Sequence, residues 1–436
     1  MLIFLGSIFF SLKFKSGDLD TKFSFFFFFP MYFSFPPSNY FLKIKYFFGK
    51  KIFSYLMLLL GIWIFSFSFF AWFKFKNKYK KYFKFLKIWF GNIFFFWFFS
   101  SNFFLFYIFY EINLIPIIIL IYGWGYPYER FKAGFYLFIY MIFFSLPFFF
   151  CLLILNNFMF LFIYYLNILD DLNLYLYLFL MMIFLVKMPL FLFHIWLSKA
   201  HVEAPISGSM ILAGIMLKLG GFGLFHILIL TMKLNLKMNF IFISICLFGM
   251  LMLSLACFFQ SDLKILIAYS SVVHMGLVII GFLVLNNLGY FGSLILMFGH
   301  GLCSSGLFCL SNICYLRFKS RSFFLNKGLI NIFSFLSFWW FLLCYYNMSF
   351  HNYFNLFGEL FLLMSLMIWL DYFYFIYFLL MILMFFYSLY LYLYTQFGKI
   401  FNNLNYLIYI NLSEYLLLFL HWLPLNLIFL IMDLFY

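Results

Sequence analysis

The sequence is poor in charged residues. Of its 436 residues only 9% are charged, 68% are hydrophobic, and the mean hydropathy is +1.10. Soluble domains are about half apolar and about a quarter charged, so this composition excludes the soluble class. Apolar runs of about 20 residues recur along the whole chain, which is typical of a helical protein that crosses a membrane many times. The runs do not alternate apolar and polar residues, as the strands of a membrane β-barrel would.

Motifs for metals, cofactors and targeting are missing as well. The seven cysteines are scattered and form no CxxC pair, so we expect small buried side chains rather than ligands or disulfides. No HxxxH or Cys/His cluster predicts zinc. No iron–sulfur, haem or nucleotide motif is visible, and the first residues lack the basic segment and cleavage site of a signal peptide. We therefore expect no cofactor and no metal in this chain.

Residues with AT-rich codons dominate the composition. The chain has 81 Phe and 34 Tyr, and it has 24 Lys against 3 Arg. Alanine, which has GC-rich codons, occurs only 7 times. This bias indicates a gene from an AT-rich organellar genome.

The net charge of +15 comes mostly from lysines in short loops, and seven of these lysines lie within residues 74–87. One interpretation is binding of nucleic acid or anionic lipid. The other is a loop that sets the topology on the positive inner side of the membrane, which we favour because such loops are rich in Lys. We therefore expect membrane lipids, but no nucleic acid, as partners.

The apolar spans become regular after residue 51. Two short Phe-rich runs, broken by charges and prolines, precede them. Together they predict an all-α polytopic membrane protein of about fourteen crossings in one membrane domain. The candidate spans from residue 52 onward are 52–73, 83–101, 103–122, 135–155, 172–196, 206–230, 239–258, 265–285, 289–314, 330–347, 354–370, 372–395 and 413–435.

Ionisable residues inside these spans are the first candidates for a functional site. Lys187, Lys218 and Glu111 lie in long apolar runs. A charge near the bilayer centre costs about 2.5–3.5 kcal/mol, so it must face protein or water. The alternatives are that the lysines reach the interface along their apolar stems, and that Glu111 forms an interhelical ion pair that only holds the bundle together. We favour ion movement, because a lysine beside a carboxylate can gain and lose a proton.

Two spans contain signals for a broken helix. Pro189 follows Lys187 by two residues, removes a backbone donor and disfavours helix at Met188. In the second half of the chain the candidate is the stretch at 352–360, where Gly358 precedes Glu359. Interrupted helices in both halves of a transporter are the best sequence pointer to its ion path. A packing or capping role is the alternative for Glu359.

Histidines add candidates for proton transfer. His274 and His300 lie in the middle of neighbouring spans. Each on its own reads as a satisfied core histidine, but the pair beside small residues equally fits a relay. His194 and His201 flank a polar junction, where the alternatives are entry points of a relay and interfacial residues; we favour an interfacial position for both. From its position Lys264 is an interfacial anchor or a partner of Asp262.

Several long segments resemble the antiporter-like subunit 4 family of respiratory complex I. The strongest is VKMPLFLFHIWLSKAHVEAPISGSMILAGIMLKLGGFGL at 186–224. The likeness covers about 88–436, and its other segments are FYIFYEINLIPI (106–117), QSDLKILIAYSSVVHMGLV (260–278), FGHGLCSSGLF (298–308), LFGELFLLM (356–364), YSLYLYLYTQFG (387–398) and YLLLFLHWLPL (415–425).

This resemblance implies a fold and a set of site residues. It implies fourteen helices with two inverted five-helix repeats and broken helices. Glu111 matches the glutamate of the fifth helix, Lys187 the lysine of the broken seventh, and Lys218 the lysine of the eighth. Two further groups, His274 and His300, match the polar residues of the central axis.

The last matching residue is Glu359. It corresponds to the glutamate of the family's broken twelfth helix, which connects to the exit path. The chain differs from the family in two places. Residues 1–87 show no match, so we divide the chain into a divergent N-terminal region with a basic loop (1–87) and a proton-translocation domain (88–436). Before the last glutamate the family has a Pro-Pro pair, where this chain has His351 and Asn352.

The resemblance also implies the function and the partners. It implies a membrane-arm subunit of the mitochondrial inner membrane that translocates protons beside other antiporter-like subunits. As part of a proton-translocating NADH:ubiquinone reductase it would carry no redox chemistry itself, because NADH, FMN, iron–sulfur clusters and ubiquinone belong to other subunits. The alternatives are a subunit of a multisubunit cation/proton antiporter and a purely structural membrane-arm subunit.

Overall fold

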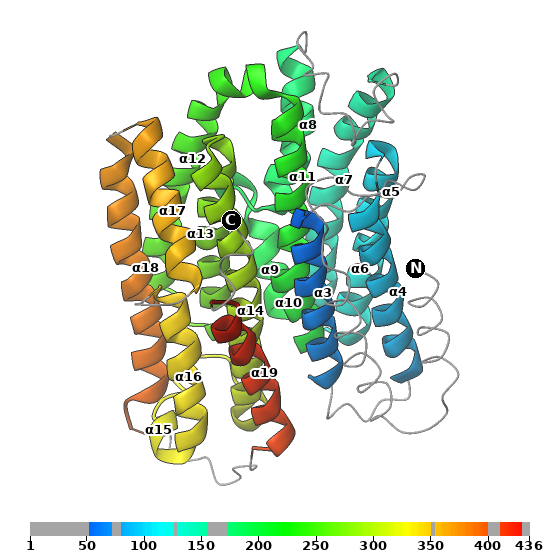
Figure 1. Ribbon diagram of the computed structural model, residues 1–436. Coiled ribbons are helices and arrows are strands. Elements are labelled where there is room, and N and C mark those ends of the chain that lie inside the picture. The colour runs from blue at the N-terminus through cyan, green and yellow to red at the C-terminus, as the bar shows by residue number, and fades with distance from the viewer. Residues whose placement is uncertain are drawn as a thin grey trace.

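The protein is a bundle of helices, as the computed structural model shows (Figure 1). The structure describes residues 52–71, 80–100, 102–125, 129–155, 173–349, 354–370, 372–399 and 410–429. Within these ranges it contains no β-strand, only an isolated bridge between Asp262 and Ser322. The all-helical prediction is therefore confirmed for the described part of the chain. The Phe-rich runs predicted before residue 52 lie outside it, as do His351 and Asn352.

The described helices follow one another along the chain. The first half of the chain forms α3 (Ile52–Phe70), α4 (Lys80–Phe99), α5 (Phe103–Ile112), α6 (Leu114–Trp124), α7 (Arg130–Ile154), α8 (Leu174–Lys187), the 3₁₀ turn η2 (Phe191–Phe193), α9 (Ile195–Glu203), α10 (Ile206–Ile211), the π-helical η3 (Leu212–Met216) and α11 (Leu217–Leu230). The second half forms α12 (Met232–Phe258), α13 (Leu263–Leu283), α14 (Asn287–Phe318), α15 (Leu329–Ile332), α16 (Ser334–Asn347), α17 (Phe354–Trp369), α18 (Tyr372–Gln396) and α19 (Leu412–Phe429).

Seven helical runs are long and apolar enough to cross a membrane: Phe103–Trp124, Arg130–Ile154, Ile206–Leu230, Met238–Phe258, Leu263–Leu283, Asn287–Phe318 and Tyr372–Gln396. Shorter apolar helices accompany them at Leu56–Phe70, Leu174–Lys187 and Phe354–Trp369. Every span predicted from residue 52 onward contains a helix. The interpretation of 330–347 and 354–370 as separate crossings is wrong, however. The two helices, α16 with 14 residues and α17 with 16, lie end to end beside α18 and together form one crossing (Figure 1).

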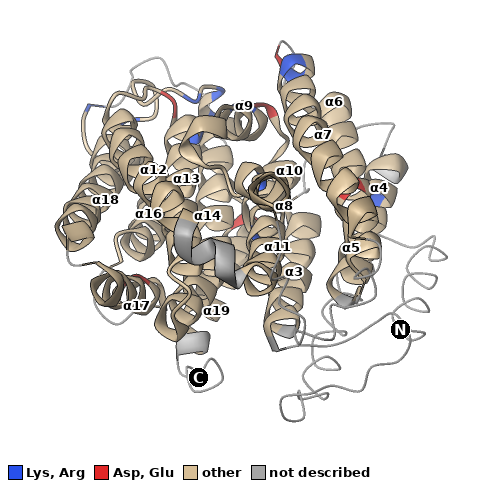
Figure 2. Ribbon diagram, turned by 90° about the horizontal axis from the view of Figure 1, so that it is seen from above, with Lys and Arg blue, Asp and Glu red and all other residues tan. Residues whose placement is uncertain are grey.

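Three crossings form the centre of the bundle. Within one apolar stretch of 18 residues in each span, the run Ile206–Leu230 (α10, η3 and α11) and helix α14 have 94% of the residues buried, and α13 has 89%. Helices α7 and α18 have only 33% buried. Viewed from above, α11, α13 and α14 lie in the middle, with α18 on one side and α4 and α7 on the other (Figure 2). The polar residues of α11, α13 and α14 are therefore held far from the lipid-facing surface.

The predicted break after Lys187 is confirmed. Helix α8 ends at this lysine, and Met188 has φ −89° and ψ 71°, outside the helical region. Pro189 has no N–H to continue the helix and restricts the residue before it. The chain resumes with η2 and then α9, so the two halves of this crossing meet at a short irregular segment inside the protein.

Two further irregularities lie near ionisable residues. Helices α5 and α6 meet at Asn113, one turn before Pro116, which cannot donate to the carbonyl of Ile112. Before Lys218 the five residues of η3 are π-helical, a turn that proteins use mostly at functional sites. In both places the regular backbone bonding is interrupted beside a charged side chain.

Candidate functional site

Lys187 lies buried at the broken end of α8, with 1% of its side chain exposed. Its ammonium donates a hydrogen bond to the carbonyl of Tyr110 at 3.3 Å and lies over the Tyr110 ring, 2.7 Å from the ring centre. The Tyr110 hydroxyl in turn donates to the carbonyl of Ile183 at 3.4 Å, one turn before the lysine. Helix α5 thus holds the lysine through both its backbone and an aromatic face. The interpretation that Lys187 reaches the interface is wrong.

Glu111 follows Tyr110 in α5 and is the nearest acid to act on this lysine. Among the described residues it forms no ion pair within 4.0 Å, and its buried Oε1 accepts no hydrogen bond. The two charges therefore interact at a distance, without the direct contact of a structural ion pair. This arrangement does not support the alternative in which Glu111 only holds two helices together.

Lys218 stands just after the π-helical turn and is 2% exposed. Its ammonium donates to the carbonyl of Ala213 at 2.7 Å and to Nδ1 of His300 at 3.0 Å. The wider π-helical turn presents the Ala213 carbonyl to the side chain, which an ordinary helix would keep for a backbone N–H. Lys218 is therefore held inside the bundle with a histidine as its partner, and it does not reach the interface.

His300 and His274 continue from Lys218 across the centre of the bundle. Their ring centroids are 5.5 Å apart, and both side chains are buried. Because the lysine donates to Nδ1 of His300, that nitrogen is the acceptor and the ring proton of the neutral form is on Nε2. The two histidines predicted to form a relay are thus brought together.

Glu359 completes the line on α17 and is fully buried. Its Oε1 lies 3.5 Å from Nδ1 of His274, and neither carboxyl oxygen has a hydrogen bond within the described structure. Tyr377 donates its hydroxyl to the backbone carbonyl of Glu359 at 2.9 Å, which fixes the helix rather than the carboxyl group. Lys218, His300, His274 and Glu359 therefore form a line of buried titratable side chains from four helices, the proton line. No hydrogen bond between described residues joins His300 to His274, so this step needs water or a movement of a side chain.

The six predicted site residues fall into two groups. Glu111 and Lys187 lie together with Tyr110, and the other four form the line from Lys218 to Glu359. No hydrogen bond or ion pair between described residues joins Lys187 to Lys218. A proton passing between these two lysines needs water or a movement of a side chain.

Two positions predicted from the junction sequence are wrong. His201 is not interfacial: it is fully buried, stacks on Phe308 at 4.6 Å between ring centroids, and has no hydrogen bond on either ring nitrogen in the described structure. Lys264 is not an interfacial anchor, because it is 1% exposed and donates to the carbonyls of Val202 at 3.5 Å and Ala204 at 3.4 Å. By contrast His194 is partly exposed and contacts the carbonyl of Phe191.

Two tyrosines contact the site residues but are not predicted from the sequence. Tyr110 supports Lys187 as described, and the Tyr387 hydroxyl lies 3.3 Å from Nε2 of His274. With 34 tyrosines in the chain, neither position stands out by residue type. The only signal is the position of Tyr110 next to an acid inside an apolar run.

Glycines of α11 allow the broken end of α8 to pack closely. A Cβ on Gly220 would lie 2.7 Å from Cγ of Met188 and 3.2 Å from Cβ of Lys187. Close approach of this kind needs a residue without a side chain. The glycines that follow Lys218 therefore hold the two lysine-bearing crossings against each other.

We expect Gly220→Ala to lower the stability of the protein by about 1–3 kcal/mol, because the added methyl overpacks the contact with Met188. The measurement is the thermal midpoint of the purified protein or its complex. Gly123→Ala is the matched control, because a Cβ there meets no atom within 4 Å. Equal midpoints for the two variants would contradict the close-packing account.

The described residues contain no group of three or more His, Cys, Asp or Glu side chains that could hold a metal ion. All seven cysteines are buried, as the sequence predicts. The candidate site consists of amines, imidazoles and carboxyl groups, which are groups that can gain and lose protons.

The sequence matches a known protein family and is similar to several of its members. Residues 100–386 match the family model described as NADH:quinone oxidoreductase/Mrp antiporter, transmembrane. The chain is 48% identical over 405 residues to NADH-ubiquinone oxidoreductase chain 4 of Ceratitis capitata, covering 90% of this chain and 89% of the relative. It is 44% identical over 401 residues to the protein of the same name from Locusta migratoria, with 90% and 89% covered.

Solved structures share the fold. A chain of respiratory complex I from Thermus thermophilus with bound NADH superposes with a TM-score of 0.82 at 21% identity, covering 94% of this chain and 90% of that one. A chain of the Mrp complex from Dietzia sp. DQ12-45-1b superposes with a TM-score of 0.73 at 14% identity, covering 81% and 68%. The predicted antiporter-like membrane fold is therefore confirmed.

Proposed function

The chain belongs to the NADH:quinone oxidoreductase/Mrp antiporter family of membrane subunits, and from this premise we propose that it is a chain 4 subunit of respiratory complex I that translocates protons. It works in the membrane arm in the mitochondrial inner membrane, beside other membrane-arm subunits. NADH oxidation and ubiquinone reduction take place in other subunits, and they supply the free energy for proton movement here.

One observation carries this proposal. Lys218, His300, His274 and Glu359 form a buried line, with contacts of 3.0 Å at its first step and 3.5 Å at its last and a ring-centroid distance of 5.5 Å between the two histidines. Burial makes every charged form expensive, so charge on one member disfavours charge on its neighbours of like sign. A structural role requires only one ion pair, whereas this line contains four groups that can each gain and lose a proton. The line therefore favours proton transfer over a purely structural role.

The transfer proceeds as a series of single proton steps. The Lys218 ammonium gives a proton to Nδ1 of His300, which it already contacts, and becomes a neutral amine. The His300 imidazolium then passes the charge to His274 when a proton leaves Nε2. From His274 the proton reaches the Glu359 carboxylate, which becomes a neutral carboxylic acid, and release from there resets the line.

Glu111 and Lys187 control the loading of this line in our proposal. Helices α8 and α11, which carry Lys187 and Lys218, pack against each other. A charge on Lys187 therefore disfavours a second cation on Lys218, whereas an ionised Glu111 holds the charge on Lys187. A change in charge that arrives from a neighbouring subunit moves the proton between these states. The interrupted backbone at Pro189 gives the lysine room to change its contacts.

The experiment that tests the assignment to complex I is purification of the chain under mild conditions. We expect it to copurify with flavin and iron–sulfur subunits and with NADH-driven proton translocation. Copurification with ion-transport subunits only, without redox centres, would instead favour the multisubunit cation/proton antiporter. The curated relatives at 44–48% identity favour complex I, while the Mrp chain shares 14%.

A purely structural subunit predicts a different outcome for site variants. If the chain only bridges its neighbours, Glu111→Gln and Lys187→Met lower the amount of assembled complex and leave proton translocation per complex unchanged. If the chain is a relay, proton translocation per assembled complex falls. The amount of complex and the rate of translocation are measured in the same purified membranes.

We expect Tyr387→Phe to slow proton translocation a few-fold without loss of assembly. The change removes only the hydroxyl near Nε2 of His274. The hydrogen bond that is lost contributes about 0.5–1.5 kcal/mol. The measurement is the ratio of proton translocation to NADH oxidation in sealed vesicles. Tyr394→Phe, on an exposed face of the same helix, is the matched control and should behave as the unchanged protein.

A further inference from the structure

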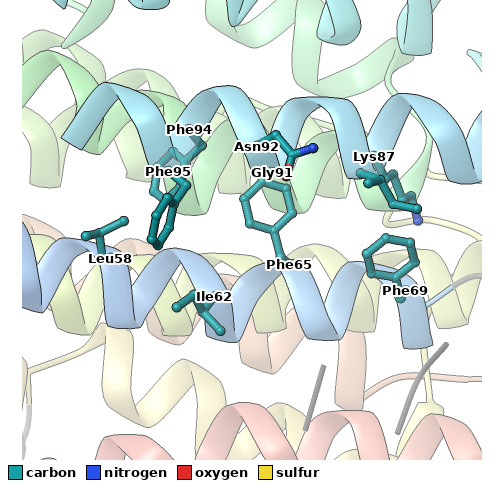
Figure 3. Close-up of a pocket in the computed structure, with 10 residues that line it drawn as sticks. Leu58, Ile62, Phe65, Phe69, Lys87, Gly91, Asn92, Phe94 and Phe95 are labelled. Atoms are coloured by element: carbon teal, nitrogen blue, oxygen red, sulfur yellow. The ribbon is translucent and has the colours of Figure 1, made fainter. Parts of the chain in front are cut away.

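A groove runs between α3 and α4, outside the proton line (Figure 3). Its walls are mostly apolar, and it contains about 420 Å³ of atom-free space, part of it open to the surroundings. Gly91 of α4 lies on its rim, where a Cβ would meet no atom within 4 Å. The other lining residues are Leu58, Ile62, Phe65, Phe69, Lys87, Ile88, Asn92, Phe94 and Phe95.

One end of the groove carries a buried cation. Figure 3 shows Lys87 at this end, with its nitrogen near Phe69. Its side chain is 1% exposed, and the ammonium donates to the carbonyl of Ser68 at 2.6 Å and lies 4.4 Å from the Phe83 ring centre and 5.2 Å from that of Phe69. None of the described carboxylates forms an ion pair with it. Buried charges are normally paired, so an anion at this end of the groove would stabilise the charged form of Lys87.

The level of this cation in the membrane follows from the ends of the helices. The carbonyl of Ser68, which accepts its hydrogen bond, belongs to the last turn of α3. From Leu58 to Phe69 the groove extends over eleven residues of α3, or about 16 Å at the helical rise. This is about half of a hydrocarbon core of roughly 30 Å, the depth of one leaflet.

The side of the membrane follows from the charges. Counted crossing by crossing, the connection from α3 to α4 lies on the same side as Arg130, Lys319, Arg321 and Lys327. The seven lysines of residues 74–87 belong to this connection and the start of α4. An excess of Lys and Arg marks the inner side, which is the matrix in a mitochondrion. Basic pockets between membrane helices on that side hold anionic lipid headgroups.

We propose that the groove between α3 and α4 binds one acyl chain of an anionic phospholipid, with its phosphate held at Lys87. The apolar walls match the acyl chain, and the cation at the leaflet surface matches the phosphate. A free phosphate would use only the cation, and a neutral lipid only the walls. The groove and the cation together therefore favour a lipid that has both an acyl chain and an anionic phosphate.

The test uses the purified intact complex in vesicles that contain a phosphatidylglycerol with a photoreactive group on its acyl chain. A phosphatidylcholine with the same acyl chain is the neutral probe. We expect the anionic probe to label peptides of residues 58–95 about fivefold more than the neutral probe, from the typical contribution of one lysine at an anionic surface. Lys87→Met should bring both probes to the same level.

Gly91→Leu tests the apolar part, because Gly91 lines the groove and a Cβ there meets no atom within 4 Å, so the larger side chain takes up space in the groove. We expect it to lower labelling by both probes, whereas Gly123→Leu, at another open glycine, changes neither. NADH oxidation by each variant complex shows that it is assembled. Equal labelling of the unchanged protein by the two probes would overturn the role of Lys87. No labelling of residues 58–95 would show that another protein segment fills the groove and overturn the proposal as a whole.

Discussion

Replacing Lys218 with methionine is expected to lower NADH-driven proton translocation by about tenfold or more in an assembled complex. Methionine keeps the length and apolar stem of the side chain but cannot carry a proton. The line then loses its first donor, because His300 receives its hydrogen bond from Lys218. The measurement is the rate of acidification or alkalinisation in sealed vesicles, divided by the amount of assembled complex.

Lys132→Met is the control for the loss of one positive charge, because Lys132 is exposed near the start of α7. It should translocate protons like the unchanged protein. Among the described residues Lys218 forms no ion pair, so its replacement leaves no buried carboxylate without its partner. Full proton stoichiometry in Lys218→Met would exclude this residue from the path.

Replacing Glu359 with glutamine is the second change for which we expect a large effect, again about tenfold or more on proton translocation. Glutamine has nearly the same shape but no site that gains and loses a proton near neutral pH. His274 would keep a polar neighbour at 3.5 Å and lose its proton acceptor. The defect should therefore appear in translocation and not in assembly.

The matched control is Asp262→Asn, which also neutralises an acid. Asp262 precedes α13, and its side chain makes no capping hydrogen bond there. We expect this variant to keep normal translocation. A Glu359→Gln complex that translocated protons at the normal rate would show that the line ends elsewhere.

Several features of the site were predictable from single residues. An apolar run that holds Lys187 and then Pro189 predicts both a buried charge and a broken helix, and both are present. The glycines after Lys218 predict close packing, which Gly220 shows against Met188. These predictions succeed because proline and glycine act locally, through the backbone, and because a charge in lipid has few tolerable environments.

Other features depend on how distant segments pack. The order in which His300 comes before His274 follows from the packing of α14 against both η3 and α13, and no spacing in the sequence encodes it. The two half-helices α16 and α17 read as two spans because each is apolar, although neither is long enough to cross alone. The burial of His201 under Phe308 likewise arises from tertiary contacts.

The most direct test of the proton line is a double-mutant cycle on proton translocation. Lys218→Met, Glu359→Gln and the double variant are measured in the same sealed vesicles, each normalised to assembled complex. If both residues serve one path, the double variant is about as slow as the slower single variant, because a path blocked once is not blocked further. A double variant whose loss equals the product of the two single losses would show that the residues act independently, and would contradict a single line from Lys218 to Glu359.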